Sequence, residues 1–214
     1  MPQHFETGIQ VSETQDRPLV CIQGLGFVGT AMALAVADAR DENGRPHFNV
    51  IGVELDTPAG LAKIEAINSG HLPMRTDDPK LQQALDRAVE AGNLTTTTDP
   101  EAYRRADVVV VDVHCDVDFE SAPSEFQPTK LQQAELQLDG LKAAIQTVGD
   151  RMRQDCLVLV ETTVPPGTCE RILAPLLKDR FQSRGLDPDQ VLLAHSYERV
   201  MPGPDYFDSI INFW

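Results

Sequence analysis

The feature of this sequence that most constrains its fold is a glycine pattern that joins two apolar segments. Gly24, Gly26 and Gly29 form the pattern G-x-G-x-x-G. Residues 18–22 before it (PLVCI) predict a short buried strand, and residues 27–40 after it contain the run TAMALAVADA, which favours a helix. The pattern alone is a weak signal, but between a strand and a helix it is the fingerprint of a dinucleotide-binding turn. An ordinary glycine-rich turn is the alternative.

Each glycine has a physical reason in such a turn. The first allows the tight turn, the second lets the backbone approach a pyrophosphate, and the third lets helix and strand pack closely. The chain of 214 residues carries 33 acidic and 18 basic side chains, a formal charge of −15, so we expect no nucleic-acid or anionic-membrane partner. Backbone N–H groups and the helix dipole in the glycine loop would still let this acidic chain hold a phosphate without a lysine.

The rest of the chain alternates between expected strands and helices. Further strands are expected over residues 48–53, 94–97, 107–113, 156–160 and 191–194. Helices are expected over residues 57–68, 79–91, 130–152 and 168–183, and residues 116–128 predict a loop. Such alternation implies parallel strands joined by right-handed crossovers. We therefore predict an α/β fold with a doubly wound parallel sheet.

This fold would form a single Rossmann-type dinucleotide-binding domain over residues 18–204. Residues 1–17 predict a polar N-terminal arm, and residues 205–214 predict the start of a truncated linker or dimerisation helix. No apolar run approaches the ~20 residues of a membrane span, and the polar start is not typical of a signal peptide. The four cysteines lack metal-ligand spacing, which predicts reduced thiols, no metal site and a cytoplasmic protein: Cys21, Cys115, Cys156 and Cys169.

The end of the second expected strand carries an acidic residue. Glu54 follows Gly52 and Val53, where a carboxylate can accept hydrogen bonds from both hydroxyls of an adenosine ribose and repel a 2′-phosphate. This favours NAD over NADP as the cofactor. Asp56 is the second candidate for the same role, and a solvated acid at the start of a loop is the alternative interpretation.

Several later segments resemble one known family in order. Residues 160–168 (VETTVPPGT) resemble the STVPPGT signature of the UDP-glucose/GDP-mannose dehydrogenase family. Residues 63–70 (KIEAINSG) and 96–99 (TTTD) resemble two further elements of that family. Residues 196–203 (SYERVMPG) are similar to the SPERVxPG form of the UDP-N-acetylhexosamine 6-dehydrogenases. The resemblance covers residues 18–214.

The resemblance implies two successive NAD-dependent oxidations, which take the C6 alcohol of a nucleotide sugar to a carboxylate in polysaccharide or lipopolysaccharide precursor synthesis. It implies Thr163, near the nicotinamide, and Glu198, which would activate water, as catalytic residues. A helix cap and a surface acid are the respective alternatives, and a solvated helix lysine is the alternative for Lys63. The implied cofactor-binding residues are Gly24, Gly26, Phe27, Val28, Gly29, Glu54, Lys63, Cys115 and Thr163.

The sequence also departs from the family pattern. Where the family reads VPTP after the fourth strand, residues 113–116 read VHCD, so Cys115 replaces a threonine that contacts the cofactor. A thiol is a poor hydroxyl substitute, which predicts an altered cofactor pocket. His114 and Cys115 are neighbours on an expected strand and would point to opposite faces, which disfavours Cys115 as a catalytic thiol. Tyr197 replaces the family proline before Glu198.

The family's nucleophilic cysteine and its sugar-nucleotide domain have no counterpart in these 214 residues. The sequence therefore predicts the NAD-binding half of a longer UDP-sugar 6-dehydrogenase, inactive by itself, homodimeric when complete and dependent on other domains for the nucleotide sugar. The main alternative is a stand-alone NAD-sensing or NAD-binding protein without dehydrogenase activity. A methyltransferase that binds S-adenosylmethionine, or an alcohol or 3-hydroxyacyl dehydrogenase, fits the motifs less well.

Overall fold

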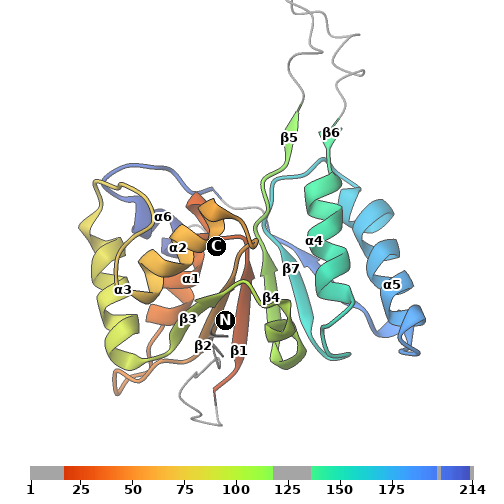
Figure 1. Cartoon of the computed structure of the whole chain (residues 1–214), viewed down its shortest axis with the longest axis horizontal. Helices are drawn as coiled ribbons and strands as arrows, with labels where there is room; N and C mark the ends of the chain where they lie inside the picture. The colour runs from red at the N-terminus through yellow and green to blue at the C-terminus, as the bar shows by residue number, and fades with distance from the viewer. Residues whose placement is uncertain (1–16, 118–135, 197–198, 213–214) are drawn as a thin grey trace, which may run out of the picture.

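The computed structural model describes residues 17–117, 136–196 and 199–212 of the chain. Within these ranges its centre is a six-stranded, fully parallel sheet (Figure 1) with the strand order β3-β2-β1-β4-β7-β8. The strands are β1 (Leu19–Gln23), β2 (Asn49–Val53), β3 (Leu94–Thr97), β4 (Val108–Val111), β7 (Leu157–Val160) and β8 (Leu192–His195). This is the doubly wound order, with the switch between its halves beside β1. The predicted fold class is confirmed.

Helices cover both faces of the sheet (Figure 1). One face carries α1 (Phe27–Asp38), α2 (Pro58–Asn68), α3 (Pro79–Ala91) and α6 (Tyr206–Asn212). The other face carries α4 (Asp139–Gly149), α5 (Ala174–Ser183), a π-helical turn (Cys169–Leu173) and the 3₁₀ helix η1 (Pro100–Arg105). A second short 3₁₀ helix, Pro188–Gln190, precedes β8.

The first strand, β1, is an almost unbroken apolar run because both of its faces are buried. In β1, Leu19 and Cys21 pack into the core under α4 and α5, whereas Val20 and Ile22 pack into the core under α1 and α3. Successive side chains of a strand point to opposite faces, so a strand between two helical layers has no polar alternation. This is why the sequence shows it as a short unbroken apolar run.

The helix ends follow local chemistry that the sequence displays. Thr57 accepts a hydrogen bond from the Gly60 amide through its hydroxyl, and Pro58 then opens α2. Asp78 caps α3 in the same way, and Gly92 ends that helix in the left-handed conformation at φ +64°.

The region between β4 and α4 differs from its prediction. A helix is expected over residues 130–152, but α4 begins at Asp139, and Leu136–Gln137 form the short strand β6. This strand pairs antiparallel with β5 (Asp116–Val117), which lies inside the expected loop. Residues 118–135 lie outside the described ranges. Such a short pairing depends on where the chain meets itself and leaves no periodic pattern in the sequence.

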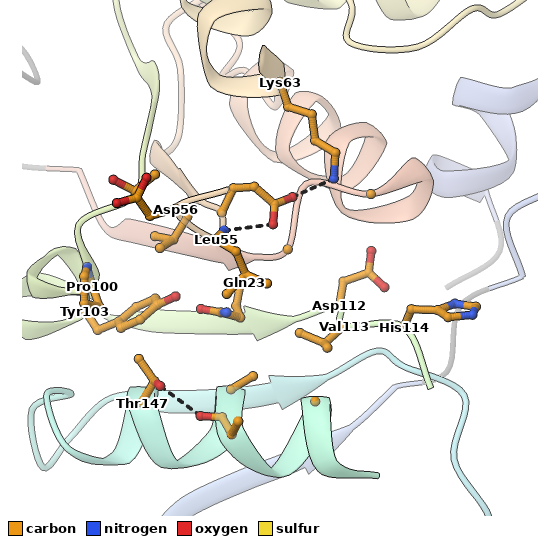
Figure 2. A pocket seen from close by; sticks show the side chains of 18 residues that line it. Gln23, Leu55, Asp56, Lys63, Pro100, Tyr103, Asp112, Val113, His114 and Thr147 are labelled. Carbon is orange, nitrogen blue, oxygen red and sulfur yellow. Dashed lines mark hydrogen bonds and ion pairs between the residues drawn. The ribbon is translucent and has the colours of Figure 1, made fainter. Parts of the chain in front are cut away.

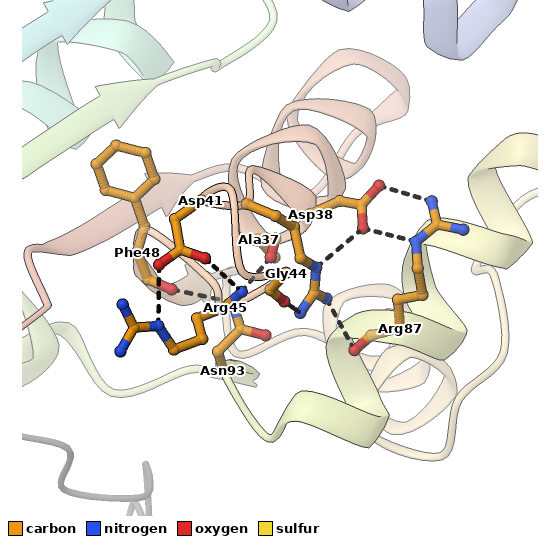
Figure 3. A network of polar contacts seen from close by, with 9 residues as sticks. Ala37, Asp38, Asp41, Gly44, Arg45, Phe48, Arg87 and Asn93 are labelled. Atoms are coloured by element: carbon orange, nitrogen blue, oxygen red, sulfur yellow. Dashed lines mark hydrogen bonds and ion pairs between the residues drawn. The ribbon is translucent and has the colours of Figure 1, made fainter.

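A polar network joins the far end of α1 to its neighbours (Figure 3). Arg87 of α3 donates to both carboxylate oxygens of Asp38, at 2.7 and 2.6 Å. The buried Asn93 donates from its amide nitrogen to the carbonyl oxygens of Ala37, at 2.8 Å, and Phe48, at 2.9 Å. These contacts fix α1 relative to β2 and α3, and therefore fix the direction in which the other end of α1 meets the glycine loop.

The final segment packs onto the domain. The sequence places residues 205–214 with a following unit, but Tyr206, Phe207 and Ile210 of α6 are buried in the core that α1 and α3 form. The packed core therefore continues past residue 204. A role of this segment as a linker or dimerisation helix stays a prediction.

Candidate functional site

A cavity of about 500 Å³ lies at the carboxyl ends of the central strands (Figure 2). Its lining comes from the ends of β1 and β2, the start of η1, residues 112–114 after β4, and one side of α4. Lys63 of α2 also reaches it. Open α/β sheets bind ligands at this position, beside the strand where the order of the sheet reverses.

The glycine loop forms one wall of the cavity, and two of its glycines are required by the protein itself. Gly24 has φ +94°, and a Cβ there would stand 2.4 Å from the carbonyl oxygen of Asp112. A Cβ on Gly29 would stand 2.0 Å from the carbonyl oxygen of Gly24. The first glycine therefore makes the turn and the third allows α1 to approach the turn.

Gly26 is different. It lines the cavity, and apart from its own neighbours along the chain no atom of the described residues lies within 4 Å of the place where its Cβ would stand. Its backbone, at φ −72° and ψ −163°, suits any residue. Neither the backbone conformation nor packing among the described residues therefore requires glycine at this position.

Gly26 is also the N-cap of α1, and no side chain caps this helix end. The first amide to bond back into the helix is that of Thr30, which donates to the carbonyl oxygen of Gly26 at 3.0 Å. The N–H groups of the preceding turn have no acceptor inside the helix and sit at the positive end of its dipole. An anion such as a pyrophosphate would satisfy them.

Phe27 and Val28 are expected at the site as part of the glycine loop. Neither side chain lines the cavity, and the ring of Phe27 stacks on the ring of Tyr206 with centroids 4.0 Å apart. Their backbone amides lie in the first turn of α1, so a role in cofactor binding would fall to these amides.

Glu54 connects β2 to the glycine loop. Its Oε2 accepts from the Lys63 ammonium at 2.8 Å and from the Leu25 amide at 3.0 Å, and its Oε1 accepts from the Leu55 amide at 2.9 Å. Burial raises the pKa of Glu54, but the Lys63 hydrogen bond and the two amides outweigh it and hold the pKa below its usual value. The carboxylate is thus charged and oriented at the cavity.

Lys63 therefore has a defined place in the structure. Its ammonium pairs with Glu54 at the cavity wall, and its side chain is 34% exposed. Contact of Lys63 with the cofactor stays a prediction. Asp56, the second candidate for the ribose role, also lines the cavity but is exposed.

Two further residues line the cavity that the sequence did not indicate as site residues. Gln23 and Tyr103 are buried, and Figure 2 shows their polar ends directed toward each other. Gln23 Oε1 and Tyr103 Oη have no hydrogen-bond partner among the described residues. A polar residue directly before the first glycine was a usable signal for Gln23, whereas nothing local marks Tyr103. Unpaired buried polar atoms at the wall of a cavity fit a ligand with polar edges, such as a nucleotide base.

The described residues that are expected near the nicotinamide end of the cofactor do not gather at one place in the cavity. Thr163 is exposed after β7 and does not line the cavity. His114 lines the cavity, whereas the Cys115 thiol lies 3.8 Å from the Gln137 carbonyl oxygen and is absent from the lining. Glu198 lies outside the described residues.

Thr162 links the segment that follows β7 to the segment that follows β4. Its hydroxyl donates to the Val113 carbonyl oxygen at 2.8 Å and accepts from the Val113 amide at 3.1 Å.

Across the described ranges, no three His, Cys, Asp or Glu side chains gather as metal ligands, and no helix is long and apolar enough to cross a membrane.

A parallel sheet in this order, a glycine loop that opens α1 and an acid at the end of β2 together define a dinucleotide-binding domain. The model of the UDP-glucose/GDP-mannose dehydrogenase family, NAD binding domain, matches residues 18–212. The chain belongs to this family, which confirms NAD as the cofactor.

Named relatives agree with this assignment. The UDP-N-acetyl-D-mannosamine dehydrogenase of Pyrococcus horikoshii is 28% identical over 90% of this chain and 39% of its own length. The GDP-mannose 6-dehydrogenase of Pseudomonas savastanoi pv. phaseolicola is 29% identical over 75% of this chain and 32% of its own. The crystal structure of the NDP-N-acetyl-D-galactosaminuronic acid dehydrogenase of Methanosarcina mazei Go1 superposes with a TM-score of 0.73 at 26% identity, over 92% of this chain and 38% of that one. The chain thus spans between about one third and two fifths of the length of these relatives.

Proposed function

We propose that this chain is the NAD-binding part of a nucleotide-sugar 6-dehydrogenase, which oxidises the C6 alcohol of a sugar to a carboxylate. Support comes from the family and from relatives whose names specify UDP-N-acetyl-D-mannosamine and GDP-mannose as substrates. The nucleotide sugar would bind mainly to parts of the relatives that this chain does not span. The proposal includes a cytoplasmic, homodimeric enzyme that supplies precursors for polysaccharide or lipopolysaccharide synthesis.

In this proposal the described residues hold and orient the cofactor. The amides of Gly26, Phe27 and Val28 would bind the pyrophosphate, while Glu54 would accept a hydrogen bond from a ribose hydroxyl. The Lys63 ammonium, held at 2.8 Å from Glu54, would donate a hydrogen bond to the same ribose of NAD. The chemistry that bound NAD supplies is the acceptance of a hydride. The roles of Thr163, Glu198 and Cys115 stay predictions from the family pattern.

The observation that carries the proposal is the empty space at Gly26. Packing within the protein explains Gly24 and Gly29, whereas Gly26 meets no such close contact, and the approach of a pyrophosphate would explain it. This contrast separates binding from folding, since the three positions lie within six residues of each other.

The matched test substitutes alanine at Gly26 and at Gly29. We expect Gly26→Ala to weaken NAD binding by more than about tenfold, because a methyl group would occupy the place of the pyrophosphate, with stability within about 1 kcal/mol of the parent. Gly29→Ala should lower the free energy of unfolding by about 2–3 kcal/mol or more through overpacking. Isothermal titration calorimetry and urea unfolding measure the two effects. Unchanged NAD affinity in Gly26→Ala would contradict the proposed site.

The parent chain should also bind NAD more tightly than NADP and form no NADH when a nucleotide sugar is added. Thermal unfolding with each cofactor and absorbance at the NADH band measure these properties. Absence of a shift with either cofactor would reject the NAD site. NADH formation by this chain alone would show that it does not need the remaining parts of its relatives.

A further inference from the structure

The last described helix returns to the glycine loop. Tyr206 of α6 is fully buried, and its ring lies 4.0 Å from the ring of Phe27 with an angle of 8° between the planes. The Tyr206 hydroxyl donates a hydrogen bond to the carbonyl oxygen of Phe27, a contact between residues 179 positions apart. Figure 1 shows α6 beside α1 on the same side of the sheet.

Tyr206 is itself held by contacts that do not involve the glycine loop. The amide of the next residue, Phe207, donates to Asp78 Oδ2 at 2.8 Å, and Asp78 is 1% exposed. Ser209 donates to the Tyr206 carbonyl oxygen at 2.7 Å and accepts from the Met201 amide at 3.3 Å. The tyrosine is therefore a fixed support for the loop.

The bonded carbonyl matters because of the geometry of the peptide unit. The C=O of Phe27 and the N–H of Val28 belong to one planar trans peptide and point in opposite directions. A hydrogen bond that holds this oxygen therefore also sets the direction of the Val28 N–H, one of the donors without an acceptor in the first turn of α1. Stacking fixes the same peptide through the Phe27 ring, which remains 37% exposed and does not line the cavity.

We propose that Tyr206 is a positioning residue for the cofactor, which orients the pyrophosphate-binding amides through Phe27 and couples α6 to the NAD site. This rests on the proposed function, specifically on pyrophosphate binding at Gly26. Coupling is reciprocal, so bound NAD stabilises the docked position of α6 to the same extent that docking favours NAD.

The direct test is Tyr206→Phe, which keeps the ring and removes the hydroxyl. We expect the Kd for NAD to rise about three- to tenfold, the range of one lost hydrogen bond. NAD should increase the protection of amides 206–212 from hydrogen exchange in the parent chain, and this increase should shrink in the variant. A residue that only stabilised the fold would lower protection with and without NAD alike and would leave the NAD-dependent increase intact.

The matched control is Lys80→Met. It removes the ion pair between Lys80 of α3 and Asp208 of α6 and leaves Tyr206 of α6 in place. Its Kd for NAD should stay within about twofold of the parent. Phe27→Leu removes the stack from the other side at a partly exposed position, and should weaken NAD binding even if Tyr206→Phe folds poorly.

The outcomes separate the two proposals. A parent chain that does not bind NAD rejects the proposed function and this inference with it. A parent that binds NAD, with Tyr206→Phe and Phe27→Leu binding equally well and an unchanged exchange response, overturns the role of Tyr206 alone.

Discussion

Glu54 shows at the scale of single residues how one side chain serves both the fold and the candidate site. It accepts from Leu25 in the glycine loop, from its own neighbour Leu55 and from Lys63 on α2. These bonds hold three separate segments at one edge of the cavity. The sequence identified the acid from its place after β2, but its bond to the loop amide required the folded chain.

The substitution Glu54→Gln tests this role through pH. The pKa of Glu54 is lowered in the folded state, so its contribution to stability is present above the unfolded value of about 4.5 and is lost as pH falls through the folded value. The free energy of unfolding of the parent should therefore decrease below about pH 4.5 more steeply than that of the variant. Urea unfolding between pH 3 and pH 7 measures the difference, and parallel curves would contradict the assignment.

The Glu54→Gln variant should also bind NAD with a smaller preference over NADP than the parent chain does. It removes the negative charge that would repel a 2′-phosphate and leaves the Lys63 ammonium in place. Asp56→Asn is the control, because Asp56 lines the cavity without these contacts. If Asp56→Asn alters cofactor preference and Glu54→Gln does not, Asp56 is the ribose acid.

At the scale of elements, α1 is held at both ends by different means. Close packing of the glycine loop defines its start, and the network of Asp38, Arg87 and Asn93 defines its end. The orientation of the first turn of α1, whose amides are proposed to bind the cofactor, therefore depends on contacts a full helix length away.

We expect Asn93→Ala to lower the free energy of unfolding by about 2 kcal/mol. It removes the donor from the Ala37 and Phe48 carbonyl oxygens at a position that is 1% exposed, and leaves acceptors unpaired at a buried site. Asn43→Ala, at an exposed turn position, is the control and should change stability by less than about 0.5 kcal/mol. Equal effects of the two variants in urea unfolding would show that the network does not stabilise α1.

Short elements are where sequence patterns failed. A helix over residues 130–152 was a reasonable expectation from its apolar spacing, and Leu141, Ile145 and Val148 do form the buried side of α4. The described helix begins only at Asp139, and residues 136–137 pair with β5 instead. Two residues per strand are too few to show a period in the sequence.

At the scale of the whole molecule, α6 packs into the same hydrophobic core as α1 and α3. Removal of residues 205–214 deletes the buried side chains of Tyr206, Phe207 and Ile210 and uncovers the surfaces beneath them. Since each large apolar side chain contributes about 1.5–3 kcal/mol when fully buried, we expect a loss of roughly 5 kcal/mol in the free energy of unfolding. Urea unfolding of the shortened chain measures it, and an unchanged midpoint would exclude α6 from the core.

The charge of the whole chain is equally informative. A formal charge of −15 disfavours polyanionic partners, yet the family binds NAD, which carries phosphates. The proposed binding of the pyrophosphate by backbone amides at the start of α1 would resolve this, because such amides attract phosphate through local dipoles that act at short range and are independent of the net charge.

The sequence by itself determined the features that depend on neighbouring residues. Glycine spacing, apolar strands, the Pro58 and Gly92 helix boundaries and the acid after β2 follow from backbone sterics and burial, which act over a few residues. Only the tertiary structure decided which distant groups meet. The contact of Tyr206 with Phe27, the meeting of Tyr103 and Gln23 at one cavity and the pairing of β5 with β6 bring together residues that are distant along the chain. Such contacts depend on the path of the whole chain, and no local pattern records it.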